Sequence, residues 1–331
     1  MTARGVKSAY DQGGSAVITV IGEALIDLVR TEGGPPVAHP GGSPANVAVG
    51  LGRLGVPVRL ITRYGKDEYG GLLAAHLAAS GVEVAPEGVH SGSTSVAHAR
   101  VDAAGVADYS FDIVWDPPDT VRVPAESRCV HTGSIAATLA PGAETVRGLM
   151  AAAHAGRRAL VSYDPNCRPS LMGDPEAARA RIEALVDLCD LVKVSDQDLE
   201  WLYPARSFLD VADEWLARGP GLVVVTRGAE GAYGVCRAGR ATMPAVSTPV
   251  VDTVGAGDAY TAGLLDALRR RDVLSPNGVR DLHSSTVAEL LVEASLIAAL
   301  TCSRPGADPP TAAEAEAYRR NVRAEIGDDC V

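Results

Sequence analysis

The sequence contains few aromatic side chains, and its cysteines are scattered. Aromatic residues make up 4% of the 331 residues, so aliphatic side chains must fill most of the core. The six cysteines form no Cys-x-x-Cys pair and no cluster with histidine at metal-ligand spacing. This pattern favours reduced thiols in a cytoplasmic protein over a disulfide framework or a zinc site.

Blocks of positive charge and long hydrophobic runs are also missing. The formal net charge is −11 and no basic cluster occurs, which argues against nucleic acid or an anionic membrane surface as the main partner. No run of roughly eighteen apolar residues is present, and residues 1–15 lack the apolar stretch of a signal peptide. We therefore expect a soluble, intracellular protein with a mobile N-terminus over residues 1–15.

Two common nucleotide-binding motifs are absent. The sequence has no Gly-x-x-x-x-Gly-Lys-Ser/Thr, which excludes a P-loop kinase. The first expected strand, Val17 to Ile21, is followed by Gly22-Glu-Ala-Leu and not by Gly-x-Gly-x-x-Gly. A dinucleotide-dependent oxidoreductase therefore lacks its phosphate-binding turn at the place where that fold needs it.

Short apolar runs alternate with longer helical patterns along most of the chain. This rhythm predicts a parallel, doubly wound sheet flanked by helices, in one domain over residues 16–331. A polar loop is expected at 275–285. Strands are expected at 17–21, 58–62, 129–131, 159–163, 191–194 and 222–225, and helices at 44–54, 69–80, 143–155, 175–188, 256–271, 286–302 and 312–326.

Two stretches break this rhythm. Residues 25–39 and 93–123 contain alternating apolar and polar positions, with turn residues at Asp102 to Gly105. They predict a small antiparallel sheet that stands off the main one as a lid. Because an exposed edge and apolar face invite pairing with a second copy, we expect a homodimer formed through this lid.

The segment Asp252 to Gly263 combines a small-residue turn with a carboxylate at the start of a helix. Val246 to Val251 is β-prone, and Gly255 and Gly257 allow a tight turn with exposed N–H groups. Such groups at a helix N-terminus attract anions, and the same dipole favours an ionised Asp258. An isolated Gly-x-Gly-Asp is more often a plain turn, so this segment predicts phosphoryl transfer only in company with others.

A second segment, Gly41 to Gly55, places two glycines before a helix. Ser43 and Pro44 have the pattern of an N-cap and first helical residue, and the first turn presents Asn46. An amide offers donors and an acceptor, which suits sugar hydroxyls, and Asp27 can accept from the same kind of group. Taken singly, Asn46 is equally a capping amide and Asp27 a turn residue.

Together, Gly41 to Gly55 with Gly65, and Asp252 to Leu265, resemble the two signatures of the PfkB/ribokinase family of carbohydrate kinases. The resemblance extends from about Val17 to about Ala307 and implies a ribokinase-like fold. Residues 22–27 and 162–168 look most like the fructokinase branch. The implied activity is transfer of the γ-phosphate of ATP to a primary hydroxyl of a small sugar, with fructose to fructose 6-phosphate as the most specific expectation.

The resemblance also implies residue roles. Asp258 matches the catalytic base, and Gly255, Ala256 and Gly257 match an anion hole built from backbone amides. The other matched positions are Asp27, Gly42 and Asn46 for sugar hydroxyls, Thr226 and Gly228 in the segment Val225 to Gly231 for the nucleotide phosphates, and Asp252 and Gly306 for a monovalent cation such as K⁺.

Four further positions carry charged or polar side chains near the expected substrates. The family commonly has Asn-x-x-Glu near the phosphates, whereas this chain has Ser195-Asp-Gln-Asp198. Asp198 can still hold Mg²⁺ through water, while Ser195 also fits a helix N-cap, and the two roles are compatible. Arg227, beside the phosphate loop, can add charge compensation, and Arg168 lies on the expected sugar side.

Several other functions stay open at this point. A 2-keto-3-deoxy-gluconate kinase would use an Arg on the lid, which 109–115 lacks, although Arg168 can meet a carboxylate. A nucleoside kinase would stack a base on Trp115 or Phe111, both of which equally fit lid packing. A non-catalytic sugar-binding sensor on the same fold is the alternative from another class.

Overall fold

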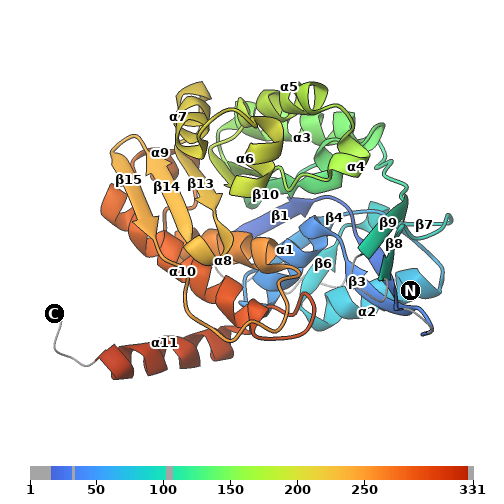
Figure 1. The fold of residues 1–331 in the computed structure, drawn as a ribbon. Coiled ribbons are helices and arrows are strands. Elements are labelled where there is room, and N and C mark those ends of the chain that lie inside the picture. Colours follow the sequence, from blue (N-terminus) through green and yellow to red (C-terminus); the bar gives the residue numbers. More distant parts are fainter. Residues whose placement is uncertain (1–15, 32–33, 102–106, 327–331) are drawn as a thin grey trace, which may run out of the picture.

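The computed structural model describes residues 16–31, 34–101 and 107–326 (Figure 1). The predicted mobile segment 1–15 and the whole predicted turn at 102–105 lie outside these ranges. Within them the chain forms a large central sheet with helices on both faces and a small sheet at one side (Figure 1).

The central sheet has nine strands in the order β15-β14-β13-β12-β11-β10-β1-β4-β6. Along this order, all pairings between β13 and β6 are parallel. The pairings of β14 with β13 and with β15 are antiparallel. The direction of winding reverses between β1 and β10, where the carboxyl ends of strands open a ligand crevice in such folds. The strands are β1 Val17–Ile21, β4 Val58–Ile61, β6 Val82–Val84, β10 Ser127–Gly133, β11 Leu160–Asp164, β12 Leu191–Ser195, β13 Leu222–Thr226, β14 Ala232–Cys236 and β15 Gly239–Met243.

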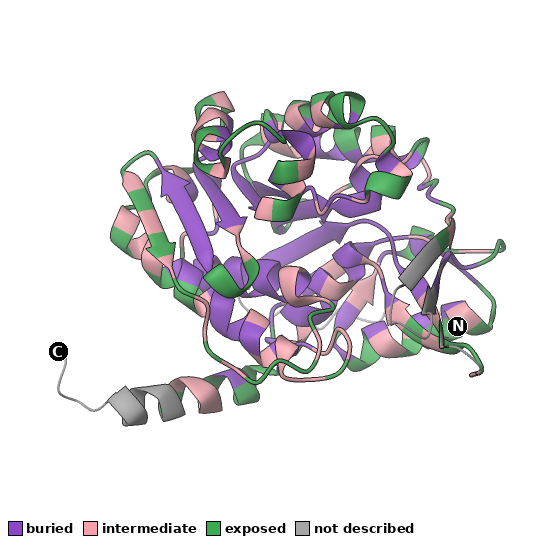
Figure 2. Cartoon of the chain, viewed as in Figure 1, coloured by how far each residue is buried: buried purple, intermediate pink, exposed green. Residues whose placement is uncertain are grey.

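Side chains alternate along each strand between two hydrophobic cores, one on each face of the sheet. Leu160 and Leu191 pack in one core, while Val161 and Val192 pack in the other. Figure 2 shows that the central strands are buried throughout. The first core is covered by α1 Ser43–Arg53, α2 Glu68–Ala79, α8 Ala256–Arg270, α10 Ser284–Cys302 and α11 Ala312–Ile326, and the second by α3 Gly142–Gly156, α5 Pro175–Val186, α6 Asp196–Leu202 and α7 Phe208–Arg218.

The predicted lid is a separate four-stranded sheet in the order β3-β2-β8-β9. Its outer pairings, β2–β3 and β8–β9, are antiparallel as expected, whereas the central pairing of β2 with β8 is parallel. The strands are β2 Leu25–Thr31, β3 Val37–Gly41, β8 Val96–Val101 and β9 Ala107–Asp112. After Asp112 the chain leaves the sheet, so residues 113–123 are not part of it.

Three local expectations are wrong. Val246 to Val251 forms no strand, because Pro249 cannot donate to a ladder and interrupts the apolar run. The 275–285 stretch is not a plain loop, since it contains the short helix α9, Pro276–Arg280, and the first turn of α10. Ser43 is the first residue of α1 and not its N-cap, which is Gly42.

Helix α10 is long and apolar enough to cross a membrane by length and composition alone. Half of that stretch is buried inside the protein, where α10 packs on α8 and on the β14–β15 hairpin. An apolar surface on both sides is what a helix buried between a sheet and other helices requires.

Candidate active site

The site is built around the first turn of α8. The helix begins at Ala256 after Gly255, which has φ 75° and ψ 0°. A side chain at position 255 would be strained in this left-handed conformation, and its Cβ would lie 2.6 Å from the Cβ of Ala307. The N–H of Ala256 donates to the carbonyl of Thr253 over 3.2 Å, and the N–H of Gly257 lies in the turn that has no intrahelical acceptor. The turn therefore presents backbone donors to an anion.

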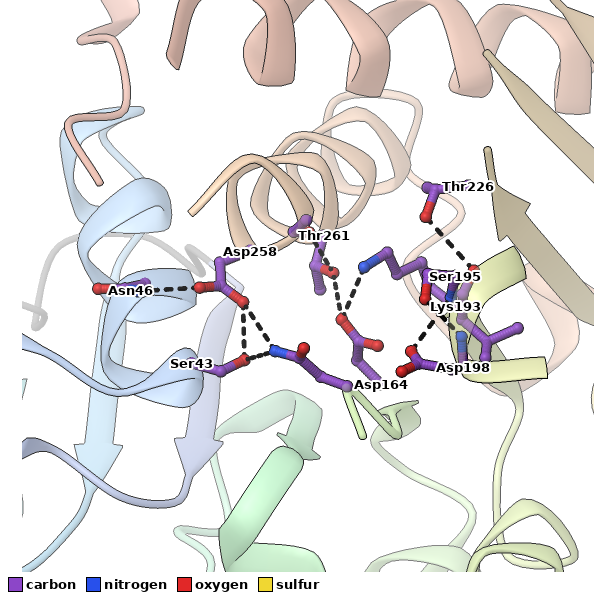
Figure 3. A network of polar contacts seen from close by, with 12 residues as sticks. Ser43, Asn46, Asp164, Lys193, Ser195, Asp198, Thr226, Asp258 and Thr261 are labelled. Atoms are coloured by element: carbon purple, nitrogen blue, oxygen red, sulfur yellow. Dashed lines mark hydrogen bonds and ion pairs between the residues drawn. The ribbon is translucent and has the colours of Figure 1, made fainter. Parts of the chain in front are cut away.

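Asp258 lies in the same turn and is 6% exposed. Ser43 Oγ donates to its Oδ1 over 2.7 Å, and Asn46 Nδ2 donates to its Oδ2 over 2.9 Å. Both donors come from the first turn of α1, which packs against α8 (Figure 3). The structure thus brings the predicted base and one predicted sugar-binding residue, Asn46, into direct contact.

Burial raises the pKa of Asp258, while the hydrogen bonds from Ser43 and Asn46 lower it. The neighbouring Asp164 carboxylate raises the pKa further, and the Lys193 ammonium opposes it. The net direction is upward. The helix dipole considered in the sequence analysis is therefore only part of the balance, and the side-chain donors and Lys193 favour the ionised form needed by a base.

Asn166 links the base to Arg168. Its Nδ2 donates to Ser43 Oγ over 2.7 Å and reaches Asp258 Oδ1 at 3.4 Å, while its Oδ1 accepts from Arg168 over 2.6 Å. Asn166 has φ 36°, a left-handed conformation that Asn adopts more readily than most residues. This tight turn after β11 holds the side chains of Asn166 and Arg168 in the region next to Asp258.

Asp27 approaches the same region from β2 of the lid. Burial raises the pKa of Asp27 to about 6, although Arg168 and His39 lower it, and the charge of Asp258 is close enough to raise it. A Cβ at position 41 would lie 2.1 Å from Asp27 Oδ2, so Gly41 leaves the room that this carboxylate occupies. Asp27, Arg168 and Asp258 are therefore close enough for their charges to interact.

Gly42 and Glu23 form the wall beside this region. Gly42 has φ 99°, and a Cβ there would lie 2.5 Å from the carbonyl oxygen of Glu23. The Glu23 side chain accepts from the N–H of Ala136 over 3.0 Å, and burial raises its pKa to about 7. At the predicted position Gly42, the absence of a side chain thus lets two backbone segments pass close together. The start of α1 therefore lies next to the segment that follows β1.

A buried ion pair that the sequence analysis did not identify lies beside the base. Lys193 Nζ in β12 is 2.8 Å from Asp164 Oδ2 at the end of β11, and Thr261 Oγ1 of α8 reaches the same oxygen at 3.4 Å. Asp164 is 1% exposed and Lys193 5%. Figure 3 shows the labelled side chains in a row, from Asn46 and Asp258 through Asp164 and Lys193 to Ser195, Asp198 and Thr226.

Ser195 and Asp198 form a capping box at the start of α6. Ser195 Oγ accepts from the N–H of Asp198 over 3.0 Å, and Asp198 Oδ2 accepts from the N–H of Ser195 at 3.4 Å. Asp198 Oδ1 also accepts from the N–H of Cys167 over 2.9 Å. Burial and the charge of Asp164 raise the pKa of Asp198. The cap expected for Ser195 is therefore present, and it fixes the Asp198 carboxylate between the start of α6 and the turn after β11.

The predicted phosphate loop follows β13. Thr226 Oγ1 donates to the carbonyl of Val194 at 3.4 Å, and Gly228 and Gly231 both have positive φ. A Cβ at position 231 would lie 2.1 Å from the carbonyl oxygen of Met243, so this glycine closes the β13–β14 turn.

Arg227 contacts α7 and the loop that follows β13. Its guanidinium lies 4.8 Å from the ring centroid of Phe208 and forms an ion pair with Glu230. The cation that reaches the first turn of α8 is Lys193, because a Cβ at position 257 would lie 3.0 Å from Lys193 Nζ. Lys193 is thus a second cation in this region that the sequence did not point to, and charge compensation by Arg227 stays a prediction.

Asp252 and Gly306 meet on the far side of the α8 turn. Asp252 Oδ2 accepts from the N–H of Gly306 over 2.8 Å, and its Oδ1 accepts from the N–H of Val254 over 3.0 Å. Burial raises the pKa of Asp252, but these and the Thr253 backbone contact outweigh it and hold the pKa below its usual range. The two positions predicted for a cation therefore lie together, 54 residues apart in sequence.

Of the two side chains considered for base stacking in a nucleoside kinase, Trp115 is buried and Phe111 is partly buried. Trp115 is 2% exposed, and its Nε1 donates to the carbonyl of Ala136 over 3.0 Å. Phe111 is partly buried against Leu25, Ala97 and Ile135. These contacts agree with the other role expected for both residues, which is packing beside the lid.

Comparison with known proteins identifies the relatives of this chain. The family model of the pfkB family carbohydrate kinases matches residues 15–314. The fructokinase of Rhizobium leguminosarum bv. trifolii is 34% identical over 283 residues, which cover 82% of this chain and 85% of that protein. Fructokinase-1 of Oryza sativa subsp. japonica is 33% identical over 325 residues, covering 93% of this chain and 98% of that protein.

Solved structures have the same architecture. Fructokinase from Xylella fastidiosa with bound ATP superposes with a TM-score of 0.82 at 27% identity, over 92% of this chain and 98% of that chain. Aminoimidazole riboside kinase from Salmonella enterica, complexed with aminoimidazole riboside and an ATP analogue, gives 0.74 at 25% identity, over 92% and 99%. The predicted ribokinase-like fold is confirmed. On the match to the family model and the two fructokinase sequences, this chain belongs to the pfkB family of carbohydrate kinases.

Proposed function

We propose that the protein is an ATP-dependent fructokinase that forms fructose 6-phosphate. The observation that carries this proposal is the buried carboxylate of Asp258. Ser43 and Asn46 hold it beside the amides of Gly255 to Gly257, and its charge is close enough to Asp27 to raise the pKa of that residue. The fructokinases among its relatives support the choice of sugar.

In the proposed reaction, a primary hydroxyl of the sugar forms a bond to the γ-phosphorus of ATP, and the bond from that phosphorus to the β,γ-bridging oxygen breaks. Asp258 accepts the hydroxyl proton, and ADP leaves with the electron pair of the broken bond. Asp27, Asn46 and Arg168 orient the sugar, with Gly42 providing close backbone approach. A positioned base contributes roughly 10²–10⁴ to such a rate.

The backbone turn at Gly255, Ala256 and Gly257 is proposed to stabilise charge on the transferred group. Phosphoryl transfer depends mainly on positioning and on compensation of the charge on the equatorial oxygens. Donors fixed at a helix N-terminus need little reorganisation during the reaction, so their effect is large in a buried site. Thr226, Gly228 and Gly231 are proposed to border the nucleotide phosphates from the β13 side, with Ser195 next to them.

Mg²⁺ fits this site through water. Among the described residues no group of three or more His, Cys, Asp or Glu could hold a metal directly. The buried Asp164 Oδ1 has no hydrogen-bond partner, and Asp164 and Asp198 carry two negative charges against the single positive charge of Lys193. Asp198 would hold the hydrated ion, which would supply charge neutralisation for the nucleotide phosphates when bound.

K⁺ is proposed to bind where Asp252 meets Gly306. The carboxylate is held ionised by backbone donors, and carbonyl groups of the two adjoining loops can complete an oxygen shell. Comparing ADP release in K⁺ with release in a bulky organic cation tests this point. Equal rates in both, with unaltered structure, would remove the cation site from the proposal.

We also propose a cytoplasmic homodimer formed through the lid. Val37 at the edge strand β3 is 51% exposed, and its cross-strand partner on β2, the half-buried Val29, lies on the same face of the lid sheet. A pair of lids would cover these side chains. Light scattering at micromolar concentration tests the dimer, and a single monomeric species would exclude it.

A coupled ADP-release screen tests the proposed activity against its alternatives. Fructose, ribose, 2-keto-3-deoxy-gluconate, adenosine and aminoimidazole riboside are offered with ATP and Mg²⁺, each with and without K⁺. Preferred turnover of fructose supports the proposal, whereas preferred turnover of the sugar acid or a riboside replaces it. Sugar binding in calorimetry without any ADP release would identify a non-catalytic sensor.

A further inference from the structure

The only lysine in the central sheet among the described residues occupies a position that the reaction above does not yet use. Lys193 follows Leu191 by two residues in β12, so its side chain points to the face of the sheet that α8 covers. Asp164 holds the equivalent face at the end of β11, where its Oδ2 pairs with Lys193 Nζ at 2.8 Å. Both charges therefore lie at the carboxyl edge of the sheet, under the first turn of α8.

The pair is not saturated by the protein. Lys193 has three N–H donors, and within the described residues Asp164 is its hydrogen-bonded partner. Asp164 Oδ1 is buried and has no hydrogen-bond partner. A buried ion pair that only held two strands together would be expected to satisfy its remaining donors and acceptors with protein groups. The unfilled positions instead point to polar ligands between β11, β12 and α8.

The contact with Gly257 defines where the ammonium points. A methyl group at position 257 would lie 3.0 Å from Lys193 Nζ, which is closer than nearly all real contacts of this kind. Glycine at this position therefore lets the ammonium approach the turn whose amides face the transferred group. The other nearby cations are engaged elsewhere, since Arg227 pairs with Glu230 and Arg168 donates to Asn166 and Cys167.

We propose that the Lys193 ammonium contacts the phosphoryl group during its transfer, and that Asp164 is the positioning residue that holds it there. The inference rests on the proposed kinase reaction and adds a side-chain cation to the backbone amides. Lys193 keeps its proton throughout and forms no covalent bond. Its contribution is to the charge that gathers on the equatorial oxygens between bond making and bond breaking.

Replacing Lys193 by Met tests the proposal, with Lys66→Met as a matched control at an exposed lysine. We expect Lys193→Met to lower kcat by about 10²–10³, while the sugar KM changes less than about threefold, because the lost contact exists mainly in the transition state. Lys66→Met should leave kcat within about threefold of wild type. A folded Lys193→Met enzyme with near-wild-type kcat would overturn the proposal.

A second variant separates catalysis from folding. Removing only Lys193 leaves Asp164 as an unpaired buried charge, which can destabilise the protein, so the neutral pair Asp164→Asn/Lys193→Gln is made as well. If the ion pair served only the fold, this double variant would recover activity. We expect it to melt as a folded protein and to stay as slow as Lys193→Met.

The final readout does not depend on the sugar. Aluminium fluoride with ADP mimics the phosphoryl group in transit, and the gain in ADP affinity on adding it is measured by calorimetry. We expect this gain to be at least about tenfold smaller in the neutral pair than in Lys66→Met. Equal gains would refute the role of Lys193 even where fructose turnover is normal. If the enzyme does not turn over fructose but the gain in ADP affinity still differs between the two variants, the sugar assignment is refuted. The role of Lys193 is then supported independently of the sugar.

Discussion

Ser43→Ala should shift the pH dependence of catalysis without removing the base. The Ser43 hydroxyl donates to Asp258 Oδ1 over 2.7 Å and accepts from Asn166 over 2.7 Å, and the residue is 7% exposed. A donor to a carboxylate stabilises the ionised form, so its loss raises the pKa of Asp258. Since a base works only when ionised, the acidic limb of kcat/KM must move to higher pH.

The size of the shift follows from the hydrogen bond. A hydrogen bond to a charged group contributes about 1.5–3 kcal/mol, and one pH unit corresponds to about 1.4 kcal/mol. Asn166 Nδ2 lies 3.4 Å from Asp258 Oδ1 and can move closer once the hydroxyl is gone, which offsets part of the loss. We therefore expect a shift of about one pH unit, with a fall in rate of about tenfold on the acidic limb and little change above it.

The assay measures kcat/KM for the sugar between pH 5 and 9, in steps of about one-half pH unit. Ser127→Ala is a matched control, because Ser127 Oγ forms a buried 2.7 Å hydrogen bond with Thr19 at the opposite end of the strands. It should lower stability similarly and leave the limb in place. If Ser43→Ala is folded and its limb coincides with that of wild type, Ser43 does not govern the ionisation of Asp258.

Three further changes have distinct expected outcomes. Asp258→Asn should lower turnover by at least ~10² while ATP affinity in calorimetry stays near that of wild type, and near-normal turnover would take the base role from Asp258. Because burial raises the pKa of Asp27 to about 6, kcat/KM for the sugar should fall as pH drops through that value, where the carboxylate gains a proton and can no longer accept from two hydroxyls. Asp27→Asn should remove this step while the limb of Asp258 remains, and should lower kcat/KM by about 10–100-fold at neutral pH; an acidic side as steep as that of wild type would assign the step to another group. Gly255→Ala should cost about 1–3 kcal/mol in urea unfolding and reduce kcat, since φ is 75° and the new Cβ would meet Ala307 at 2.6 Å. Gly81→Ala, at φ 73° with its nearest contact at 4.0 Å, isolates the backbone strain and should leave kcat unchanged.

The parts of the fold that local pattern decides were predictable. The helix expected at 312–326 and the strand expected at 17–21 have those bounds in the structure, and the helix expected at 256–271 ends one residue earlier. Each has a consistent apolar period over its whole length. The hairpin β14–β15 was missed because Gly234 and Gly239 interrupt its pattern, and α9 because it is short and lies in a polar stretch.

The site divides in the same way. The turn at Gly255 to Asp258 and the helix start with Asn46 are local motifs, so the sequence could indicate them. Ser43 appeared to be a helix cap, because nothing local reveals a carboxylate 215 residues away. Lys193 had one usable signal, a single charge within an otherwise apolar strand, and such a charge in a buried strand requires a partner.

The arrangement of charge explains how a deeply buried base can still work. Burial and the nearby Asp164 both disfavour the ionised form of Asp258, and one helix dipole near a surface contributes only about 0.3–1 kcal/mol against them. Ser43, Asn46 and the Lys193 ammonium act in the other direction through fixed contacts. The same ammonium is bound to Asp164, so the carboxylate that opposes ionisation is also the group that holds the compensating cation in place. A substitution at Asp164 should therefore alter both the ionisation of the base and the position of the cation, and its effect should not add to that of Lys193→Met.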